Sequence, residues 1–299
     1  MCTAARSRFL FSPFFGASPV FFLTHTSHSP AADRAGASSG GAQAHAKPRL
    51  ALFDLDHTLL PIDSDFEWGQ FTTRIGWCDP VDFGRRNNAF FADYQAGTLD
   101  VHDYVRFATE ALRARGAQAA AAAHARFMQE VVQPAIRPEA LALLRQHQDA
   151  GDQVLIITAT NEFVTTPIAR ALGVQELIAV QLARGEDGWY TGAIEGVPSM
   201  RAGKVTRMQE WLAARGWGWG DVHSTFYSDS LNDVPLLECV DVPVATNPDA
   251  RLRALATERG WRVLDLFPLQ AAVPEPVPGE TPVPSTAPAA RADASAARP

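Results

Sequence analysis

The stretch Ala51-Leu52-Phe53-Asp54-Leu55-Asp56-His57-Thr58 indicates the fold of this chain. An apolar run, Leu50 to Phe53, is followed at once by two carboxylates that stand two residues apart. If the run forms a buried strand, Asp54 and Asp56 lie at its carboxyl end, where open α/β sheets bind their ligands. Two acids there can divide a reaction, one attacking an electrophile while the other handles a proton. The alternative is a strand that ends in an ordinary Asp-rich turn.

Strand patterns recur along the chain and predict an α/β fold with a parallel sheet. They lie at Val154–Ile157, Thr225–Tyr227, Val242–Ala245 and Arg262–Leu266, and helical patterns separate most of them. We expect these helices at residues 161–172, 199–215, 231–239 and 249–259, the last with Asn247 as its cap and Gly260 at its end. Gly-rich and aromatic alternation over residues 177–195 predicts a β-hairpin at the sheet edge.

The first crossover is far longer than a βαβ unit needs, because residues 63–133 have a helical pattern throughout. Phe66, Gln70, Phe71 and Ile75 are expected to line one face of the first helix, with Trp68 offset from it. We therefore predict an inserted all-α cap domain at 63–133. The core, a Rossmann-like sheet, would comprise residues 48–62 and 134–269.

Both ends differ from the middle in composition. Residues 1–47 form a disordered or misassigned leader in our interpretation, with an export signal as the alternative, and the Pro- and Ala-rich residues 270–299 form a disordered tail. The net charge of −7, without a basic block, argues against a nucleic-acid partner. No apolar segment is long enough to cross a membrane. Three scattered cysteines fit a reducing compartment, so a cytoplasmic protein is expected, as a monomer or homodimer.

Three further segments carry candidate chemistry. Thr158, at the end of the second strand, and the N–H groups that follow from Ala159 onward could hold phosphate oxygens, although such a threonine taken alone is more often a helix cap. Lys204 stands near the start of a helix, and a lone lysine is most often a solvated charge. Asp229 and Asp233 follow the strand at 225–227. These two acids would repel one another unless a cation is bound, and oxygen ligands suit Mg²⁺.

The four segments together resemble the haloacid-dehalogenase superfamily, in particular subfamily IB, the phosphoserine-phosphatase-like hydrolases, from about Leu50 to Phe267. The resemblance implies a Rossmann-like core with a C1-type cap. It makes Asp54 the nucleophile and Asp56 the general acid/base. It implies Mg²⁺ as cofactor, with the Asp54 carboxylate, the Asp56 backbone carbonyl and the Asp229 carboxylate as ligands and Asp233 as close support.

The resemblance also implies the substrate contacts. Thr158, Ala159, Lys204 and Asn232 would bind the phosphate group. Asp63 stands where phosphoserine phosphatases commonly have Glu, and it could receive a substrate ammonium or only cap the next helix. Motif two, usually continued by paired glycines, here reads Ala159-Thr160, and motif four has Ser228 and Ser230 in place of glycines.

These features predict a Mg²⁺-dependent phosphomonoesterase acting on a small phosphorylated metabolite such as phosphoserine or histidinol phosphate. One alternative is a phosphotransferase or mutase of the same superfamily. Another is a module that binds a phosphorylated ligand without catalysis. A dehalogenase is disfavoured because that chemistry does not use the second acid, and Asp56 is present.

Overall fold

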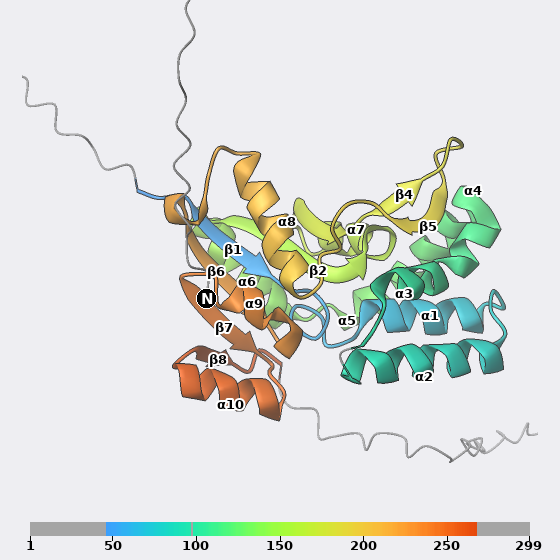
Figure 1. The fold of residues 1–299 in the computed structure, drawn as a ribbon, viewed down its shortest axis with the longest axis horizontal. Coiled ribbons are helices and arrows are strands. Elements are labelled where there is room, and N and C mark those ends of the chain that lie inside the picture. The colour runs from blue at the N-terminus through green and yellow to red at the C-terminus, as the bar shows by residue number, and fades with distance from the viewer. Residues whose placement is uncertain (1–45, 97, 268–299) are drawn as a thin grey trace, which may run out of the picture. The chain divides into compact units, whose positions relative to one another are not determined.

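A computed structural model describes residues 46–96 and 98–267. Its main sheet has six parallel strands in the order β3-β2-β1-β6-β7-β8 (Figure 1). The strands are β1 (Arg49–Phe53), β2 (Gln153–Asn161), β3 (Glu176–Val180), β6 (His223–Ser228), β7 (Val242–Thr246) and β8 (Arg262–Leu264). The predicted α/β fold with a parallel sheet is therefore confirmed.

β1 lies in the middle of the sheet because all of its residues after Arg49 are apolar and buried, as a strand covered on both faces requires. It pairs with β2 on one side and β6 on the other. Strand order reverses there, since β2 and β3 extend one way and β6 to β8 the other. The carboxyl ends of β1 and β6 therefore meet at the switch point, where such sheets bind ligands.

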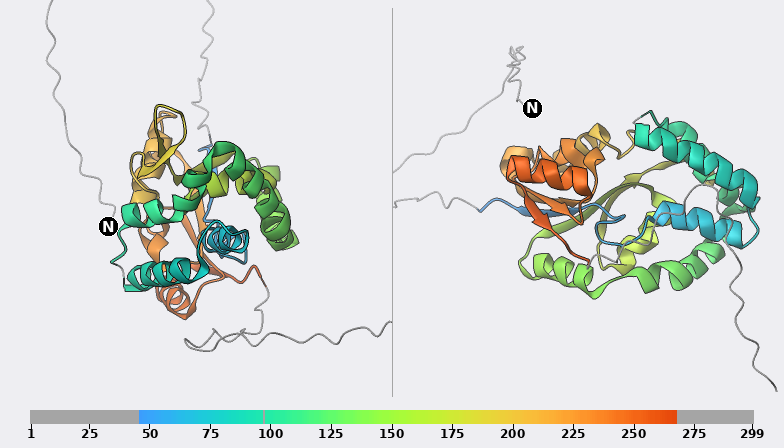
Figure 2. Two further views of the ribbon diagram at one scale, coloured as in Figure 1. Left: turned by 90° about the vertical axis from the view of Figure 1, so that its right-hand side faces the viewer. Right: turned by 90° about the horizontal axis from the view of Figure 1, so that it is seen from below.

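Helices cover both faces of this sheet. Apolar side chains of α8 (Ala202–Ala213), α9 (Val234–Leu237) and α10 (Ala250–Arg259) pack in one cluster with the inward side chains of β1, β2 and β6. α6 (Pro138–Asp149) leads into β2, and α7 (Glu162–Ala171) connects β2 to β3. The view from below in Figure 2 shows helices on either side of the strands.

Two predicted helices, at 161–172 and 249–259, each begin one residue later than predicted, and the predicted cap of the second is wrong. β2 continues through Asn161, whose side chain caps α7 by accepting from the Val164 N–H at 3.2 Å. Asp249, and not Asn247, caps α10, because its carboxylate accepts from the Leu252 N–H at 2.7 Å. The side chain of Asn247 instead donates to the His57 carbonyl at 2.8 Å. Gly260 ends α10 in the left-handed conformation, as predicted.

The long first crossover is helical, and its helices lie beside the sheet (Figure 1). Gly116, at φ 77°, kinks the fourth helix, so the segment is not one unbroken pattern. These elements are α1 (Ser64–Arg74), α2 (Pro80–Ala96), α3 (Val101–Ala108), α4 (Glu110–Phe127), the π-helical turn η1 (Met128–Val132) and α5 (Gln133–Ala135). We call this segment the insert. Its boundaries as a separate domain stay a prediction.

The buried face of α1 differs from the predicted one. Trp68 and Phe71 are buried, whereas Phe66 is 46% exposed. Trp68 packs against Phe127 of α4 and Phe163 of α7, at ring-centroid distances of 5.3 and 5.5 Å. α1 therefore packs against both α4 and α7, and in that orientation its buried face does not include Phe66.

The predicted hairpin is partly right. Residues 177–180 belong to β3, the edge strand of the main sheet, and the hairpin itself is β4 (Leu182–Arg184) with β5 (Tyr190–Ile194) in a separate two-stranded sheet. Tyr190 and Ile194 pack with Val105 of α3, so the hairpin lies against the insert. Alternation of apolar residues predicts a strand but not the surface that the strand will cover.

The predicted leader at 1–47 and tail at 270–299 lie outside the described residues, apart from residues 46 and 47. Within the part of the chain that the structure describes, none of the helices is long and apolar enough to cross a membrane.

Candidate active site

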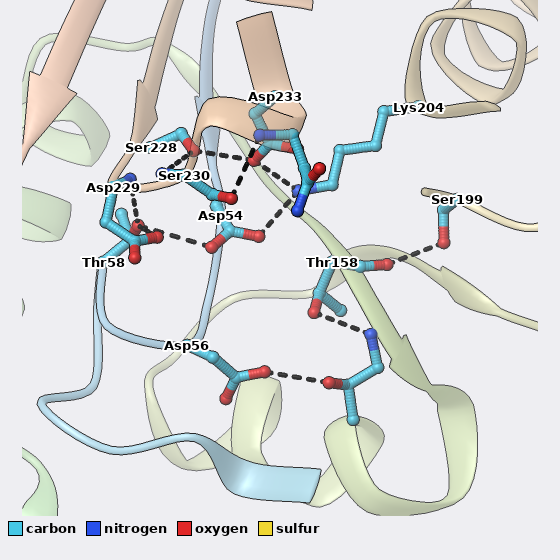
Figure 3. Close-up of polar contacts among 12 residues, drawn as sticks. Asp54, Asp56, Thr58, Thr158, Ser199, Lys204, Ser228, Asp229, Ser230 and Asp233 are labelled. Atoms are coloured by element: carbon cyan, nitrogen blue, oxygen red, sulfur yellow. Dashed lines mark hydrogen bonds and ion pairs between the residues drawn. The ribbon is translucent and has the colours of Figure 1, made fainter. Parts of the chain in front are cut away.

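Lys204 lies between two carboxylates at the carboxyl ends of the central strands. Its Nζ donates to Asp54 Oδ1 at 2.7 Å and to Asp233 Oδ2 at 2.6 Å (Figure 3). The lysine side chain is only 2% exposed. Burial by itself would lower the pKa of Lys204, but the Asp233 and Asp54 carboxylates outweigh burial and raise that pKa above its ordinary value. The ammonium is therefore a fixed positive charge beside Asp54, and Lys204 is not a solvated surface charge, as a lone lysine most often is.

The local sequence explains how Lys204 reaches this place. It stands in the first turn of α8, and the residue before the helix, Arg201, adopts a positive φ of 53°. Gly203 packs so tightly that a Cβ at this position would overlap the Pro198 carbonyl oxygen. The glycine thus lets the start of α8 approach the preceding loop, which directs Lys204 into the site.

Thr58 lies between Asp54, which follows β1, and Asp229, which follows β6. Its Oγ1 lies 3.1 Å from Asp229 Oδ1 and 3.4 Å from Asp54 Oδ2, and it accepts from the Asp229 N–H at 3.0 Å. Burial raises the pKa of Asp229 well above its ordinary value, and the Asp54 and Asp233 carboxylates raise it further. Thr58 belongs to the first motif but was not among the predicted site residues.

Asp233 is the second carboxylate that accepts a hydrogen bond from Lys204. Its Oδ2 also accepts from Ser228 Oγ at 2.7 Å, and Ser228 Oγ in turn accepts from the Ser230 N–H at 3.1 Å. The serine that replaces a family glycine is therefore a hydrogen-bonding part of the site. Sequence reasoning missed this role, because Ser228 looked only like a departure from the motif.

The donor set suits a divalent cation. Asp54, Asp229 and Asp233 bring three carboxylates against one lysine, and such oxygen ligands are what Mg²⁺ prefers. In the described residues, no three His, Cys, Asp or Glu side chains already enclose a metal position. The predicted set needs only the carboxylates of Asp54 and Asp229 with the Asp56 carbonyl. The residues fit, and Asp233 stays a predicted ligand whose Oδ2 contacts Lys204.

Asp56 has very different neighbours. Its Oδ1 accepts from the Ser64 N–H at 2.8 Å, and its Oδ2 accepts from Thr160 Oγ1 at 2.9 Å. Burial, followed by the Asp63 carboxylate, raises the pKa of Asp56 to about 8, although the Ser64 hydrogen bonds oppose the shift. Asp56 is therefore suited to carry a proton near neutral pH. Sequence reasoning did not identify Thr160 as a contact of Asp56.

Thr158 is 1% exposed and lies within β2, so it does not cap a helix. Its Oγ1 accepts from the Thr160 N–H at 3.1 Å, and its carbonyl accepts from Ser199 Oγ at 2.6 Å (Figure 3). Ala159, the next residue, is exposed at the end of the strand. Both residues thus lie on the strand next to β1, and their phosphate-binding role remains a prediction.

Asn232 lies on the short 3₁₀ turn η3 (Leu231–Asp233), where its Oδ1 accepts from Arg201 Nε at 3.3 Å. Tyr94 of α2 lies against the same turn. Burial raises the pKa of the Tyr94 hydroxyl, and hydrogen bonding with Ser230 and Asn232 opposes the shift. The insert therefore reaches the β6 side of the site through Tyr94, which sequence reasoning did not predict to be a site residue.

Asp63 caps α1. Its Oδ1 accepts from the backbone N–H groups of Asp65 and Phe66 at 3.0 and 2.9 Å. Two residues further on, Asp65 accepts from Tyr104 Oη at 2.5 Å and from Asn161 Nδ2 at 3.2 Å. Burial raises the pKa of Asp65 to about 6, while the Tyr104 hydrogen bond opposes the shift. The cap role of Asp63 is thus observed, and its predicted contact with a substrate ammonium stays a prediction.

Comparison with known proteins agrees with this geometry. Residues 51–238 match the haloacid dehalogenase-like hydrolase family. The chain is 44% identical over 217 residues to a histidinol-phosphatase of Neisseria meningitidis serogroup C (strain 8013), a match covering 72% of this chain and 98% of that protein. It is 35% identical over 222 residues to a phosphoserine phosphatase of Mycobacterium tuberculosis (strain ATCC 25618 / H37Rv), covering 72% and 70%.

Among solved structures, a protein of unknown function from Bordetella pertussis Tohama I is 49% identical, with a TM-score of 0.71, and the match covers 74% of this chain and 100% of that one. This chain therefore belongs to the haloacid dehalogenase-like hydrolase family. The predicted resemblance and the prediction of a HAD-type phosphatase are confirmed. The roles of the individual site residues, the partners and the cytoplasmic location stay predictions.

Proposed function

We propose that this chain is a Mg²⁺-dependent phosphomonoesterase that hydrolyses a small phosphorylated metabolite through a phosphoaspartate on Asp54. The observation that carries the proposal is the contrast between the two acids that follow β1. Asp54 is paired with the buried ammonium of Lys204, whereas burial raises the pKa of Asp56 to about 8. Such a pair supplies an ionised nucleophile and a proton donor at the same pH.

The reaction then has two balanced steps. An oxygen of Asp54 attacks phosphorus, the bond from phosphorus to the leaving oxygen breaks, and Asp56 gives its proton to that oxygen. In the second step a water attacks the phosphoaspartate, Asp56 takes a proton from the water, and the bond from phosphorus to Asp54 breaks. Lys204 holds Asp54 in place during both steps. Mg²⁺, held by Asp54, Asp229 and the Asp56 carbonyl, would offset the charge between the carboxylate and the phosphate oxygens.

The substrate we favour is an amine-bearing alkyl phosphate, with histidinol phosphate before phosphoserine. Support comes from the histidinol-phosphatase, which this chain matches over nearly the whole length of that relative. Asp63 and Asp65 also place two carboxylates at the start of α1, and this end of the helix contacts the site through the hydrogen bond from the Ser64 N–H to Asp56. A cationic group on the leaving alcohol would be attracted there.

The test is a panel of phosphorylated metabolites incubated with the purified chain and Mg²⁺. We expect inorganic phosphate to be released fastest from histidinol phosphate, with phosphoserine and p-nitrophenyl phosphate as comparisons. Release of phosphate from none of them, by a folded and Mg²⁺-loaded protein, would contradict the proposal. Transfer of the phosphate to an added alcohol with no release to water would instead establish a phosphotransferase.

A further inference from the structure

Thr160 is one of the two residues at which the second motif departs from the paired glycines of phosphoserine phosphatases. In the structure it lies on β2, 104 residues from Asp56 in the sequence, and its Oγ1 donates to Asp56 Oδ2 at 2.9 Å. Thr160 is held in place, because it is only 8% exposed and its backbone N–H donates to Thr158 Oγ1. The hydroxyl therefore comes from a fixed position.

The other oxygen of the same carboxyl group is held from a different part of the molecule. Asp56 Oδ1 accepts from the N–H of Ser64, the first residue of α1 and hence of the insert. One oxygen is thus fixed by the sheet and the other by the insert. A carboxyl group with a donor on each oxygen cannot rotate freely about its terminal bond, so both contacts together set the direction in which its proton is presented.

The character of these donors is also informative. The hydrogen bonds that the described residues make to the Asp56 carboxyl group come from neutral groups, a hydroxyl and a backbone amide. A lysine in the place of Thr160 would favour the charged form of Asp56 and oppose its role as a proton donor. A neutral hydroxyl restrains the group in either protonation state, because a carboxyl oxygen can accept from it with or without the Asp56 proton, which stays available for the substrate.

We propose that Thr160 is a positioning residue for the acid/base chemistry of Asp56, and that it directs the Asp56 proton at the leaving oxygen of the substrate. The inference rests on the proposed function, in which Asp56 protonates the leaving alcohol. The inference also explains why threonine replaces glycine here. A glycine has no hydroxyl, so another group would have to hold the Asp56 carboxyl group.

The proposal is tested by the dependence on the leaving group. An alkyl phosphate expels a strongly basic alkoxide and needs the proton of Asp56, whereas p-nitrophenyl phosphate expels a phenolate that needs little assistance. For Thr160→Val we expect kcat/KM to fall by about 10- to 100-fold with glycerol 2-phosphate, a fraction of what general acid catalysis provides. With p-nitrophenyl phosphate it should fall less than about 3-fold, since kcat/KM covers only steps up to release of the leaving group.

Two further variants separate positioning from packing. Thr160→Ser keeps the hydroxyl and should restore most of the activity on glycerol 2-phosphate. Thr165→Val removes a buried hydrogen bond inside α7, from Thr165 Oγ1 to the Asn161 carbonyl, and should leave the ratio between the two substrates unchanged. Equal losses on both substrates for Thr160→Val, or no loss on either, would overturn the inference.

A crystal structure of Thr160→Val gives a readout that does not depend on activity. We expect the Asp56 carboxyl group to turn away from its place in the wild-type protein. An Asp56 that keeps the same orientation in the variant would overturn the inference even if the wild type hydrolysed neither substrate, an outcome that by itself would contradict the proposed function and not the positioning role.

Discussion

The site has two sides, which differ in the groups that contact their carboxylates. On the side of β6 and α8, Asp54 and Asp233 share the buried Lys204, and Asp229 stands beside them. On the side of the insert, Asp56 and Asp65 are held by hydroxyl, amide and backbone N–H groups. Burial raises the pKa of acids on both sides, Asp229 included, so the two sides differ in the groups that hold the carboxylates. The same residue type thus acquires different chemistry from its neighbours, so an ionised nucleophile and a proton donor can follow one strand.

The largest expected effect is on the Lys204 side. Asp54→Asn should lower phosphate release by roughly 10⁴-fold or more, because an amide cannot attack phosphorus and the groups of such a site act together. The fold should persist, since Lys204 keeps Asp233 as a partner. Phosphate release and circular dichroism check both statements. The comparison between the two sides would fail if the folded variant lost only a few-fold in rate.

Removing metal should have the next largest effect, because the Lys204 side has more carboxylates than cations. Chelation with EDTA is expected to lower activity by at least about 10²-fold, which corresponds to about 2.7 kcal/mol of lost charge stabilisation. Mg²⁺ should restore the rate, and Ca²⁺ should not, since its looser coordination misplaces the reacting oxygens. Mg²⁺ should also raise the Tm of the wild type. Full activity after exhaustive chelation would exclude the metal-assisted account.

On the insert side, Asp65 should make stability depend on pH. Its folded pKa, about 6, lies above the ordinary value of 3.8, so the folded state holds the proton more tightly than the unfolded state. The contribution of Asp65 to stability is therefore fully present below pH 3.8 and is lost as the pH rises through about 6. Between those limits the wild type should lose up to about 3 kcal/mol relative to Asp65→Asn.

Urea unfolding of both proteins at a series of pH values between 4 and 8 measures this difference. Asp103→Asn is the matched control, because Asp103 is an exposed acid of the same insert that pairs with Arg106 on the surface. Its difference from the wild type should hardly change over the same range. A constant difference for Asp65→Asn would show that the Asp65 carboxyl group is not held in its protonated form.

The smallest expected effect concerns substrate choice at Asp63. If this acid receives a substrate ammonium, Asp63→Asn should raise KM for histidinol phosphate by roughly 10- to 100-fold and leave p-nitrophenyl phosphate nearly unchanged, since a charged hydrogen bond contributes about 1.5–3 kcal/mol. Asparagine still caps a helix, so the fold should hold.

Asp100→Asn provides a matched control for that measurement. Asp100 caps α3 with the same geometry, accepting from the His102 and Asp103 N–H groups, and it should leave both substrates unaffected. If Asp63→Asn changed the two substrates equally, Asp63 would be a structural cap, and the preference for an amine would need another residue.

The sequence alone predicted the parallel sheet, the helical first crossover and the acids at the strand ends. Those features depend on local patterns: a strand buried on both faces must be apolar, and residues that follow neighbouring parallel strands must meet at one edge. Asp54 and Asp229 come together for that reason, because β1 and β6 are hydrogen-bonded neighbours. The placement of Lys204 beside them followed from the family resemblance.

Only the tertiary structure decided how each acid is held. The contact from Thr160 to Asp56 and the packing of Trp68 against Phe127 and Phe163 join segments far apart in the chain. Periodicity describes which side of an element is apolar, but it does not say which distant element will cover that side or where a hydroxyl will point. The sequence therefore determined which groups were available, and packing determined which of them carries a charge and which carries a proton.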